Sequence, residues 1–265
     1  MEDMFGLSGK TAAVWGGGQG LGAASARHLA RAGCNVAVVD YVSERAEQIA
    51  GEIRALGRRA VALTADATNE EEVQAAVTSA EAALAPIDVM VTVVGMATWK
   101  PLLDMDANDW SRDIALNLNS FLYSSRAVVR SLQRTGRNGA IVGITSVSGL
   151  VSAPMHSPYG AAKAALIHLV RSMAVEWGPA VRVNAVAPGV IETPRVAATP
   201  ERVAAVRSRL PMKRMGTVDE IANAVLFLAS DLASYVTGHT LPIDGGWTSA
   251  FLMDPSLGRD LSREI

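Results

Sequence analysis

The chain has 265 residues, of which 49% are hydrophobic and 19% charged, enough for the packed core of one large α/β domain. Its formal net charge of −2 argues against a nucleic-acid or membrane-surface partner, because both need clustered Lys and Arg. The single Cys34 excludes an internal disulfide and a cysteine-built metal site, and the acidic start of the chain lacks the features of a secretory signal. We therefore expect a cytoplasmic protein that acts on a small molecule.

Short apolar runs alternate with amphipathic segments in the first part of the chain. Residues 10–15, 35–40 and 60–64 are almost entirely apolar and predict buried strands. Apolar residues at helical spacing follow each of these runs. After the third run, Thr68 and Glu71 have the spacing of a capping box, which predicts that Thr68 starts the next helix.

The alternation continues through the rest of the chain. Residues 89–94, 140–145 and 181–186 predict three further strands, and residues 110–132 predict a long helix between the first two. Strands that are apolar throughout and separated by helices are typical of a parallel sheet covered on both faces. We therefore predict an α/β fold with a single doubly wound, Rossmann-type parallel sheet of about seven strands. No linker or repeat divides the chain, so residues 1–265 are expected to form one domain.

Two segments depart from this pattern. Residues 190–215 contain Pro194 and Pro211 and no apolar run, while Thr199 followed by a proline starts a helix, so we predict a substrate lid there. Residues 248–265 are expected to form a C-terminal tail. Its apolar residues need cover, which a neighbouring subunit would supply.

A glycine-rich turn, Gly16-Gly-Gly-Gln-Gly20-Leu-Gly22, follows the first predicted strand and opens the first helix. Glycines let the backbone approach phosphate groups, and a helix N-terminus presents free N–H groups to them. Asp40 ends the second strand and supplies the carboxylate that hydrogen-bonds an adenosine ribose. That carboxylate would repel a 2′-phosphate, so the sequence favours NAD over NADP, with Arg45 as the nearby basic residue that argues otherwise. The alternative interpretation of the glycines is a plain tight turn.

Tyr159 and Lys163 lie one helical turn apart, and Ser146 lies upstream of them. An unperturbed tyrosine titrates near a pKa of about 10 and is protonated at neutral pH. An ammonium on the same helix face favours the phenolate, so the pair predicts a phenol that takes a proton from an alcohol. The alternative is a solvated pair on an alanine-rich helix, worth about a few tenths of a kcal/mol.

Together these motifs resemble those of the short-chain dehydrogenase/reductase family, and the resemblance extends over residues 7–247. The glycine-rich turn is similar to the family's TGxxxGxG motif, and Tyr159 with Lys163 to its YxxxK motif. Asn117 resembles the family's helix asparagine, and Ser146 fits its catalytic serine.

The resemblance implies a role for each residue of the site. Tyr159 is expected to be the general acid/base, and Lys163 to lower its pKa and to hold the nicotinamide ribose. Ser146 would hold the substrate oxygen, and Asn117 a water molecule of a proton relay. The segment 184–193 resembles the one that flanks the nicotinamide, and Asp66 is expected at the adenine edge or as a turn residue. The implied cofactor contacts are Gly16, Gln19, Gly20, Leu21, Gly22, Asp40, Tyr41, Asp66, Ala67, Gly95, Tyr159, Lys163, Pro188, Gly189, Ile191 and Thr193.

The chain departs from the family pattern at two places. Trp15 stands where the family has Thr, and Thr92-Val93-Val94 stands where it has Asn-Asn-Ala. The usual side chains tie strand ends together by hydrogen bonds, so we expect apolar packing to replace those bonds here.

The resemblance also implies a mostly apolar substrate pocket. Its expected residues are Met96, Ala97, Val147, Ala153, Met155, Val190 and Ile191, with His156 beside them. An apolar wall suits a hydrophobic secondary alcohol or ketone, such as an alicyclic terpenoid or steroid. His156 either bonds a polar group of the substrate or is a pocket-edge residue without a direct role.

Other functions remain open at this point. The lid carries an excess of basic residues, namely Arg195, Arg202, Arg207, Arg209, Lys213 and Arg214. These suit a thioester carrier and hence a 3-oxoacyl thioester reductase, or they form a solvated helix face. A different class is a non-catalytic NAD-sensing binding protein, against which the complete catalytic set argues. The four histidines show no metal-ligand spacing, so no metal is expected, and the resemblance implies a homotetramer.

Overall fold

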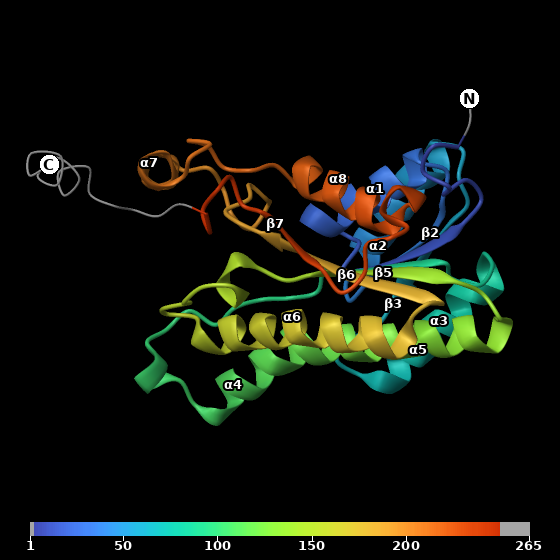
Figure 1. Ribbon diagram of the computed structural model, residues 1–265, viewed down its shortest axis with the longest axis horizontal. Coiled ribbons are helices and arrows are strands. Elements are labelled where there is room, and N and C mark those ends of the chain that lie inside the picture. Colours follow the sequence, from blue (N-terminus) through green and yellow to red (C-terminus); the bar gives the residue numbers. More distant parts are fainter. Residues whose placement is uncertain (1–2, 250–265) are drawn as a thin grey trace, which may run out of the picture.

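A single parallel sheet of seven strands forms the centre of the molecule (Figure 1), in a computed structural model that describes residues 3–249. The strand order is β3-β2-β1-β4-β5-β6-β7, and every neighbouring pair is parallel. The strands are β1 (Thr11–Trp15), β2 (Asn35–Asp40), β3 (Ala60–Thr64), β4 (Val89–Thr92), β5 (Gly139–Ile144), β6 (Val181–Pro188) and β7 (Thr240–Ile243). The predicted doubly wound sheet is therefore confirmed.

Helices cover both faces of the sheet, as Figure 1 shows. One face packs against α1 (Gly20–Arg31), α2 (Ser43–Ala55) and α8 (Val218–Ala229). The other packs against α3 (Glu70–Ala83), α5 (Ser120–Thr135) and α6 (Ser157–Trp177), with α4 (Ala107–Ile114) beside α6. Strand order reverses between β1 and β4, and in such sheets ligands bind at the carboxyl ends of the strands beside that reversal.

Local capping residues decide where α3 and α4 begin, and the N-cap of each helix differs from the one expected from the sequence. Asn69, and not Thr68, caps α3: its Oδ1 accepts from the amides of Glu71 and Glu72 at 3.0 and 3.3 Å. Thr68 instead donates its hydroxyl to Asp66 at 2.7 Å, so its side chain is already engaged. The predicted capping box at Thr68 is wrong because Asn is preferred to Thr as an N-cap and the Thr68 hydroxyl is bonded to Asp66.

The helix predicted over 110–132 begins earlier and changes its pitch. Asp106 caps α4, accepting from the amides of Asn108 and Asp109 at 2.8 Å each. A π-helical turn over Ala115–Asn119 then joins α4 to α5 without a break. The wider turn contains Asn117, and such π-bulges occur frequently at functional sites.

The departures at the ends of β1 and β4 are accommodated by packing, as expected. Trp15 is buried in the core between the sheet and α5, although its Nε1 has no hydrogen-bond partner among the described residues. β4 ends at Thr92, earlier than predicted, and the Val93 amide then donates to the Trp15 carbonyl at 2.9 Å. Val93 and Val94 pack against the core on either face of the sheet, while the Thr92 hydroxyl keeps a side-chain hydrogen bond of 3.1 Å with Ser124.

The predicted lid contains α7 (Pro200–Arg209), with Thr199 as its N-cap as expected. The base of the segment is attached to the body through paired hydrogen bonds between residues 190–192 and Gly216. Among residues 3–249 no helix has the length and apolar character needed to cross a bilayer. Of the predicted tail at 248–265, residues 250–265 lie outside the described part of the chain.

Candidate active site

In the glycine-rich turn between β1 and α1, the backbone of Gly22 packs directly against the backbone of Gly16. A β-carbon built on Gly22 would lie 2.0 Å from the Gly16 carbonyl oxygen, so no side chain fits there. The first turn of α1 contains no acidic residue, and its N-cap, Gln19, makes no side-chain capping bond. Free N–H groups at a helix N-terminus whose first turn holds no acidic residue suit a phosphate group. The turn therefore fits the pyrophosphate of a dinucleotide.

Asp40 lies at the end of β2 beside this turn and is 7% exposed. Its Oδ2 accepts from the Gly18 amide at 2.9 Å, and its Oδ1 accepts from the Val42 amide at 3.1 Å. These bonds hold the carboxylate where the adenosine ribose is expected. Arg45 approaches the same place, since a β-carbon on Gly18 would lie 2.6 Å from the Arg45 β-carbon. Both the acidic and the basic residue weighed in the sequence thus reach the turn.

The catalytic residues expected from the sequence come together at the carboxyl ends of β4 and β5. Lys163 is 2% exposed, and its Nζ donates to the Ile144 carbonyl at 2.9 Å. The same Nζ lies 5.6 Å from the centre of the Tyr159 ring, one helical turn earlier on α6. Ser146 follows β5, and its hydroxyl lies close enough to the Tyr159 side chain to lower the pKa of that phenol. The tyrosine, lysine and serine therefore form one cluster.

Burial shapes the acidity of both ionisable groups in this cluster. It raises the pKa of Tyr159, an effect that the Ser146 hydrogen bond opposes. It also lowers the pKa of Lys163 from 10.5 to about 7. Burial is therefore the largest influence on the Tyr159 pKa, and the lowering expected from the lysine stays a prediction. Burial disfavours a charged Tyr159 or a charged Lys163 when only one of them is ionised. A Tyr159 phenolate and a Lys163 ammonium that are present together stabilise each other.

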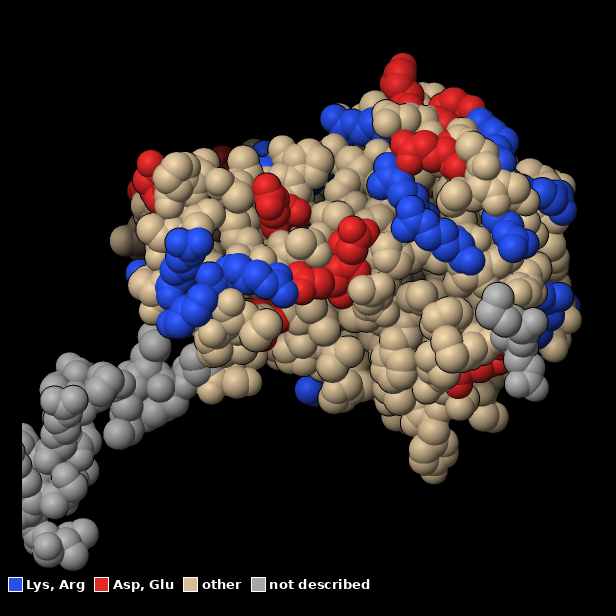
Figure 2. All heavy atoms as spheres, turned by 90° about the horizontal axis from the view of Figure 1, so that it is seen from above, with Lys and Arg blue, Asp and Glu red and all other residues tan. Residues whose placement is uncertain are grey.

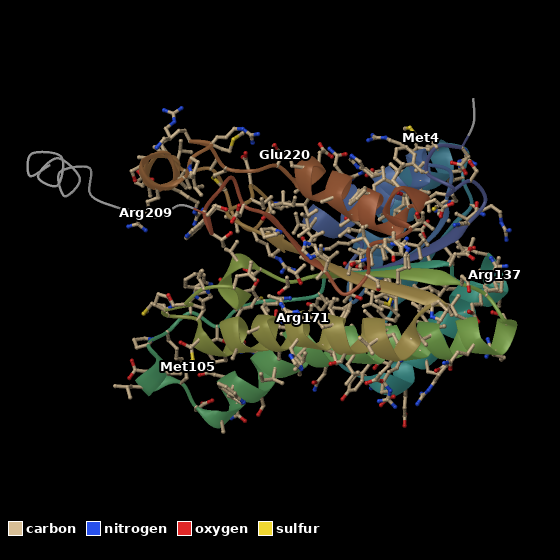
Figure 3. All side chains as sticks on the ribbon, in the orientation of Figure 1. Met4, Met105, Arg137, Arg171, Arg209 and Glu220 are labelled. Carbon is tan, nitrogen blue, oxygen red and sulfur yellow. The ribbon has the colours of Figure 1, made fainter. Side chains whose placement is uncertain are left out.

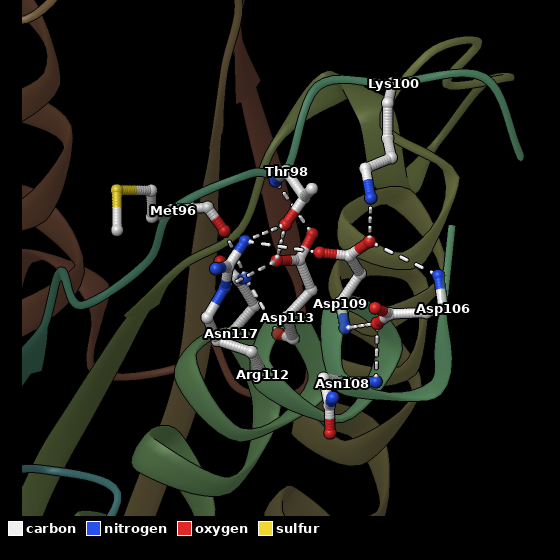
Figure 4. A network of polar contacts seen from close by, with 9 residues as sticks. All are labelled: Met96, Thr98, Lys100, Asp106, Asn108, Asp109, Arg112, Asp113 and Asn117. Carbon is white, nitrogen blue, oxygen red and sulfur yellow. Dashed lines mark hydrogen bonds and ion pairs between the residues drawn. The ribbon is translucent and has the colours of Figure 1, made fainter. Parts of the chain in front are cut away.

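Asn117 lies beside the lysine and is held in a fixed orientation by two hydrogen bonds (Figure 4). Its Nδ2 donates to the Met96 carbonyl at 2.7 Å and to the Asp113 carbonyl at 2.8 Å. Its buried Oδ1 has no partner among the described residues. A β-carbon on Gly95 would meet this Oδ1 at 2.5 Å and the Lys163 Nζ at 3.1 Å. An unpaired buried acceptor next to a buried donor suits a bridging water molecule.

The other expected cofactor residues lie around the same edge of the sheet. Asp66 is exposed after β3, where its Oδ1 accepts from the Thr68 amide at 2.8 Å, so it already acts as a turn residue. Pro188 ends β6, and the Gly189 amide donates to Ile243 at 3.0 Å. Thr193 lies at the beginning of the lid, close to Gly20. Ala67 and Ile191 are buried, whereas Tyr41 is exposed.

The expected substrate wall is partly open to solvent. Met96 and Met155 are exposed, and Met155 has a backbone φ of 69°, in the left-handed region. Val147 and Ala153 lie inward: Val147 is buried, and a β-carbon on Gly160 of α6 would lie 2.5 Å from that of Ala153. Val190 packs with the lid core, and Ala97 is half-buried.

His156 connects this wall to the tyrosine. Its ring nitrogens lie 3.1 Å from Ser148 Oγ and 2.8 Å from the Pro154 carbonyl oxygen. Its ring lies 5.7 Å from that of Tyr159 and 4.2 Å from that of Trp99, which is 69% exposed. Sequence reasoning missed Trp99, although an exposed aromatic soon after a strand end is a usable signal.

Two further residues were missed for want of a local signal. Asp113 is buried on α4 and accepts from the Thr98 amide at 3.0 Å and the Thr98 hydroxyl at 2.7 Å (Figure 4). It thereby fixes the segment that carries Met96 and Trp99. Arg195, counted only among the basic residues of the lid, reaches Gly95 and Gln19. Within residues 3–249 no three His, Cys, Asp or Glu side chains are grouped to hold a metal ion.

Comparison with known proteins agrees with this geometry. A family model described as enoyl-(acyl carrier protein) reductase matches residues 16–248. The chain is 40% identical over 243 residues to cis-4-hydroxycyclohexanecarboxylate dehydrogenase of Sinomonas cyclohexanicum, covering 91% of this chain and 97% of that protein.

Solved structures extend the agreement to the fold. A short-chain type dehydrogenase/reductase from Mycobacterium marinum superposes with a TM-score of 0.89 at 33% identity, over 94% of this chain and 99% of that one. A 7α-hydroxysteroid dehydrogenase complexed with NADH and 7-oxo glycochenodeoxycholic acid gives a TM-score of 0.88 at 36% identity, over 93% of this chain and 97% of that one. The chain therefore belongs to the short-chain dehydrogenase/reductase family of oxidoreductases.

Proposed function

We propose that the protein interconverts a hydrophobic secondary alcohol and its ketone with NAD(H), using Tyr159 as general acid/base. The observation that carries this proposal is the cluster of Tyr159, Lys163 and Ser146, with the unpaired oxygen of Asn117 beside the lysine. The broader conclusion, an oxidoreductase that acts on CH–OH groups, follows from the family and from relatives that are alcohol dehydrogenases.

The chemistry divides between the protein and the dinucleotide. When bound, the oxidised nicotinamide supplies the acceptor for the hydride that leaves the carbinol carbon. Tyr159 takes the hydroxyl proton, and Ser146 donates a hydrogen bond to the substrate oxygen. Lys163 holds a positive charge beside the phenolate, and its proton exchanges with a water bound at Asn117 Oδ1. A positioned general base typically contributes roughly 100- to 10,000-fold to the rate.

NAD is the proposed cofactor in preference to NADP. Support comes from the Asp40 carboxylate, which two backbone amides hold beside the glycine-rich turn. A 2′-phosphate brought to that carboxylate would meet like charge at close range. Arg45 is the opposing consideration, so the ratio of kcat/KM for the two dinucleotides tests this assignment.

The proposed substrate is alicyclic. The wall near Tyr159 exposes Met96, Trp99 and Met155, and apolar surface there would pack against a ring system. Two relatives are named for cyclic alcohols, a hydroxycyclohexanecarboxylate in one case and a hydroxysteroid in the other.

A 3-oxoacyl thioester reductase is the second candidate, and the basic surface of the lid favours it. Figure 2 shows Lys and Arg side chains gathered at the end of the molecule where α7 lies, and Figure 3 shows Arg209 at the end of that helix. Arg214 is less available to bind a thioester carrier than the other basic residues of the lid, because it forms an ion pair with Glu220 at 2.6 Å. A non-catalytic NAD sensor is the third candidate, although a sensor has no need of a phenolic base.

We also propose a homotetramer in the cytoplasm, assembled through α4, α5, α6 and β7. Exposed Trp110 on α4 and Val175 on α6 support this arrangement, because a second subunit would bury them. Light scattering after size-exclusion chromatography would give a mass about four times 27.8 kDa, and a mass of one chain would refute it.

Steady-state kinetics would decide among the candidates. We expect NADH formation from cyclohexanol-type and steroid alcohols, with kcat/KM at least about tenfold above that for reduction of acetoacetyl-CoA. A linear polyol serves as the matched polar alcohol and should react poorly. Preference for the thioester would favour the second candidate. Tight NADH binding without turnover across the panel would favour the sensor.

A further inference from the structure

We infer that Arg195 binds the pyrophosphate of the dinucleotide and latches the lid onto it, an inference that rests on the proposed NAD(H) dependence. The guanidinium lies between two of the expected cofactor contacts. Its Nη1 donates to the Gly95 carbonyl at 3.4 Å on one side. On the other side, with the Gln19 amide oxygen turned toward it, Nη2 and Nε donate to that oxygen at 2.6 and 3.0 Å.

The lid backbone aims the arginine at this place. Thr193 and Val196 exchange backbone hydrogen bonds of 3.2 and 3.0 Å, which closes a tight turn with Pro194 and Arg195 at its tip. A β-carbon built on Gly20 would lie 3.9 Å from Pro194 Cδ and 4.0 Å from Thr193 Cβ. The tip of the lid therefore lies against the glycine-rich turn.

The electrostatics of this corner favour an anion. The N-terminus of α1 carries a partial positive charge, and its first turn holds no acidic residue. Arg195 adds a full positive charge and has no ion-pair partner among the described residues. Its acceptors at Gln19 and Gly95 are neutral, and hydrogen bonds from a guanidinium to phosphate oxygens are stronger than bonds to neutral acceptors.

Exchange of these acceptors couples cofactor binding to lid closure. A pyrophosphate at the glycine-rich turn offers oxygens to a planar guanidinium that already lies at the site. The exchange replaces bonds to an amide and a carbonyl oxygen by charge-assisted bonds, and so stabilises Thr193 and Pro194 in their position against the glycine-rich turn. Arg195 is thus a binding residue of the lid, separate from the proton-transfer cluster.

Binding measurements with and without the pyrophosphate test this inference. Calorimetry would give Kd values for NADH, ADP-ribose and adenosine with wild type, Arg195→Ala, Arg195→Lys and Arg202→Ala. Arg202 is the matched control, because it lies on the same lid and donates to the Ala197 carbonyl. We expect Arg195→Ala to weaken NADH and ADP-ribose roughly 10- to 100-fold, with adenosine changed less than about twofold. The affinities of Arg195→Lys should lie between those of wild type and Arg195→Ala, since lysine keeps the positive charge but lacks the planar set of N–H donors of a guanidinium.

The controls separate this inference from the proposed function. Arg202→Ala should bind all three ligands as wild type does, and circular dichroism should show that the exposed substitutions leave the fold intact. Unchanged NADH affinity in Arg195→Ala would overturn the role of the arginine alone. Equal weakening of adenosine would also overturn it, because adenosine has no pyrophosphate. Wild type that binds neither NADH nor ADP-ribose would overturn the inference and the proposed function together.

Discussion

Lys163 should make the stability of the protein depend on pH. It is buried with one hydrogen-bond acceptor, the Ile144 carbonyl, and burial lowers its pKa from 10.5 to about 7. Between these values the unfolded chain binds a proton that the folded chain does not, so the free energy of unfolding rises with pH. The difference between the pKa values of Lys163 in the unfolded and folded chain corresponds to roughly 5 kcal/mol of unfolding free energy.

Substitution by methionine isolates this effect. In Lys163→Met the side chain stays unbranched and is one atom shorter, and it does not titrate, so the contribution of the lysine disappears. The unfolding free energy of wild type, relative to that of the variant, should rise by roughly 2 to 3 kcal/mol between pH 7.5 and 9.5. Tyr159 does not interfere in this range, because burial raises its pKa.

Urea unfolding followed by circular dichroism at several pH values measures this difference. Lys213→Met, which removes an exposed lysine of the lid, is the matched control and should stay parallel to wild type. A wild-type minus Lys163→Met difference that does not change with pH would refute the reasoning. It would mean that the lysine stays charged when folded, with a partner that the described contacts do not contain.

Three further predictions concern the cofactor and the proton. Gly22→Ala places a β-carbon 2.0 Å from a backbone oxygen, so we expect NADH affinity to fall at least about tenfold by calorimetry, and wild-type affinity would contradict the close approach. Asp40→Ser removes the carboxylate beside the ribose and should shift the kcat/KM ratio toward NADP by about tenfold or more; an unchanged ratio would leave Arg45 as the determinant. Alcohol oxidation should rise with pH from 6 to about 10, because Tyr159 must lose its proton and burial raises its pKa, while ketone reduction should fall only as the pH approaches that raised pKa; an oxidation rate that does not change from pH 6 to about 10 would exclude Tyr159 as the base.

The central strands of the sheet were predictable from the sequence because they are buried on both faces. Runs such as 36–39 and 140–144 are continuous and apolar, and short-range pattern suffices to find them. The N-cap of α3 was harder to predict, since Thr68 and Asn69 both carry a side-chain oxygen that can accept from the first amides of a helix. Which of them caps depends on the neighbouring bond between Thr68 and Asp66, a feature of the folded turn.

The candidate site was predictable where its residues form motifs, and not where contacts span the chain. Tyr159 and Lys163 are one helical turn apart, so their proximity follows from local geometry. Arg195 meets Gly95 across a separation of 100 residues, and no local pattern indicates that approach. The direction of the Tyr159 pKa also required the folded protein, because burial is a property of packing.

The most direct test of the account is the kinetics of Tyr159→Phe with a cyclic secondary alcohol and NAD. The substitution removes one hydroxyl and leaves the ring beside His156 and Lys163. We predict that turnover falls by about three orders of magnitude, while the Kd for NADH stays within about twofold of wild type. Retention of most of the activity would contradict the assignment of Tyr159 as the general acid/base.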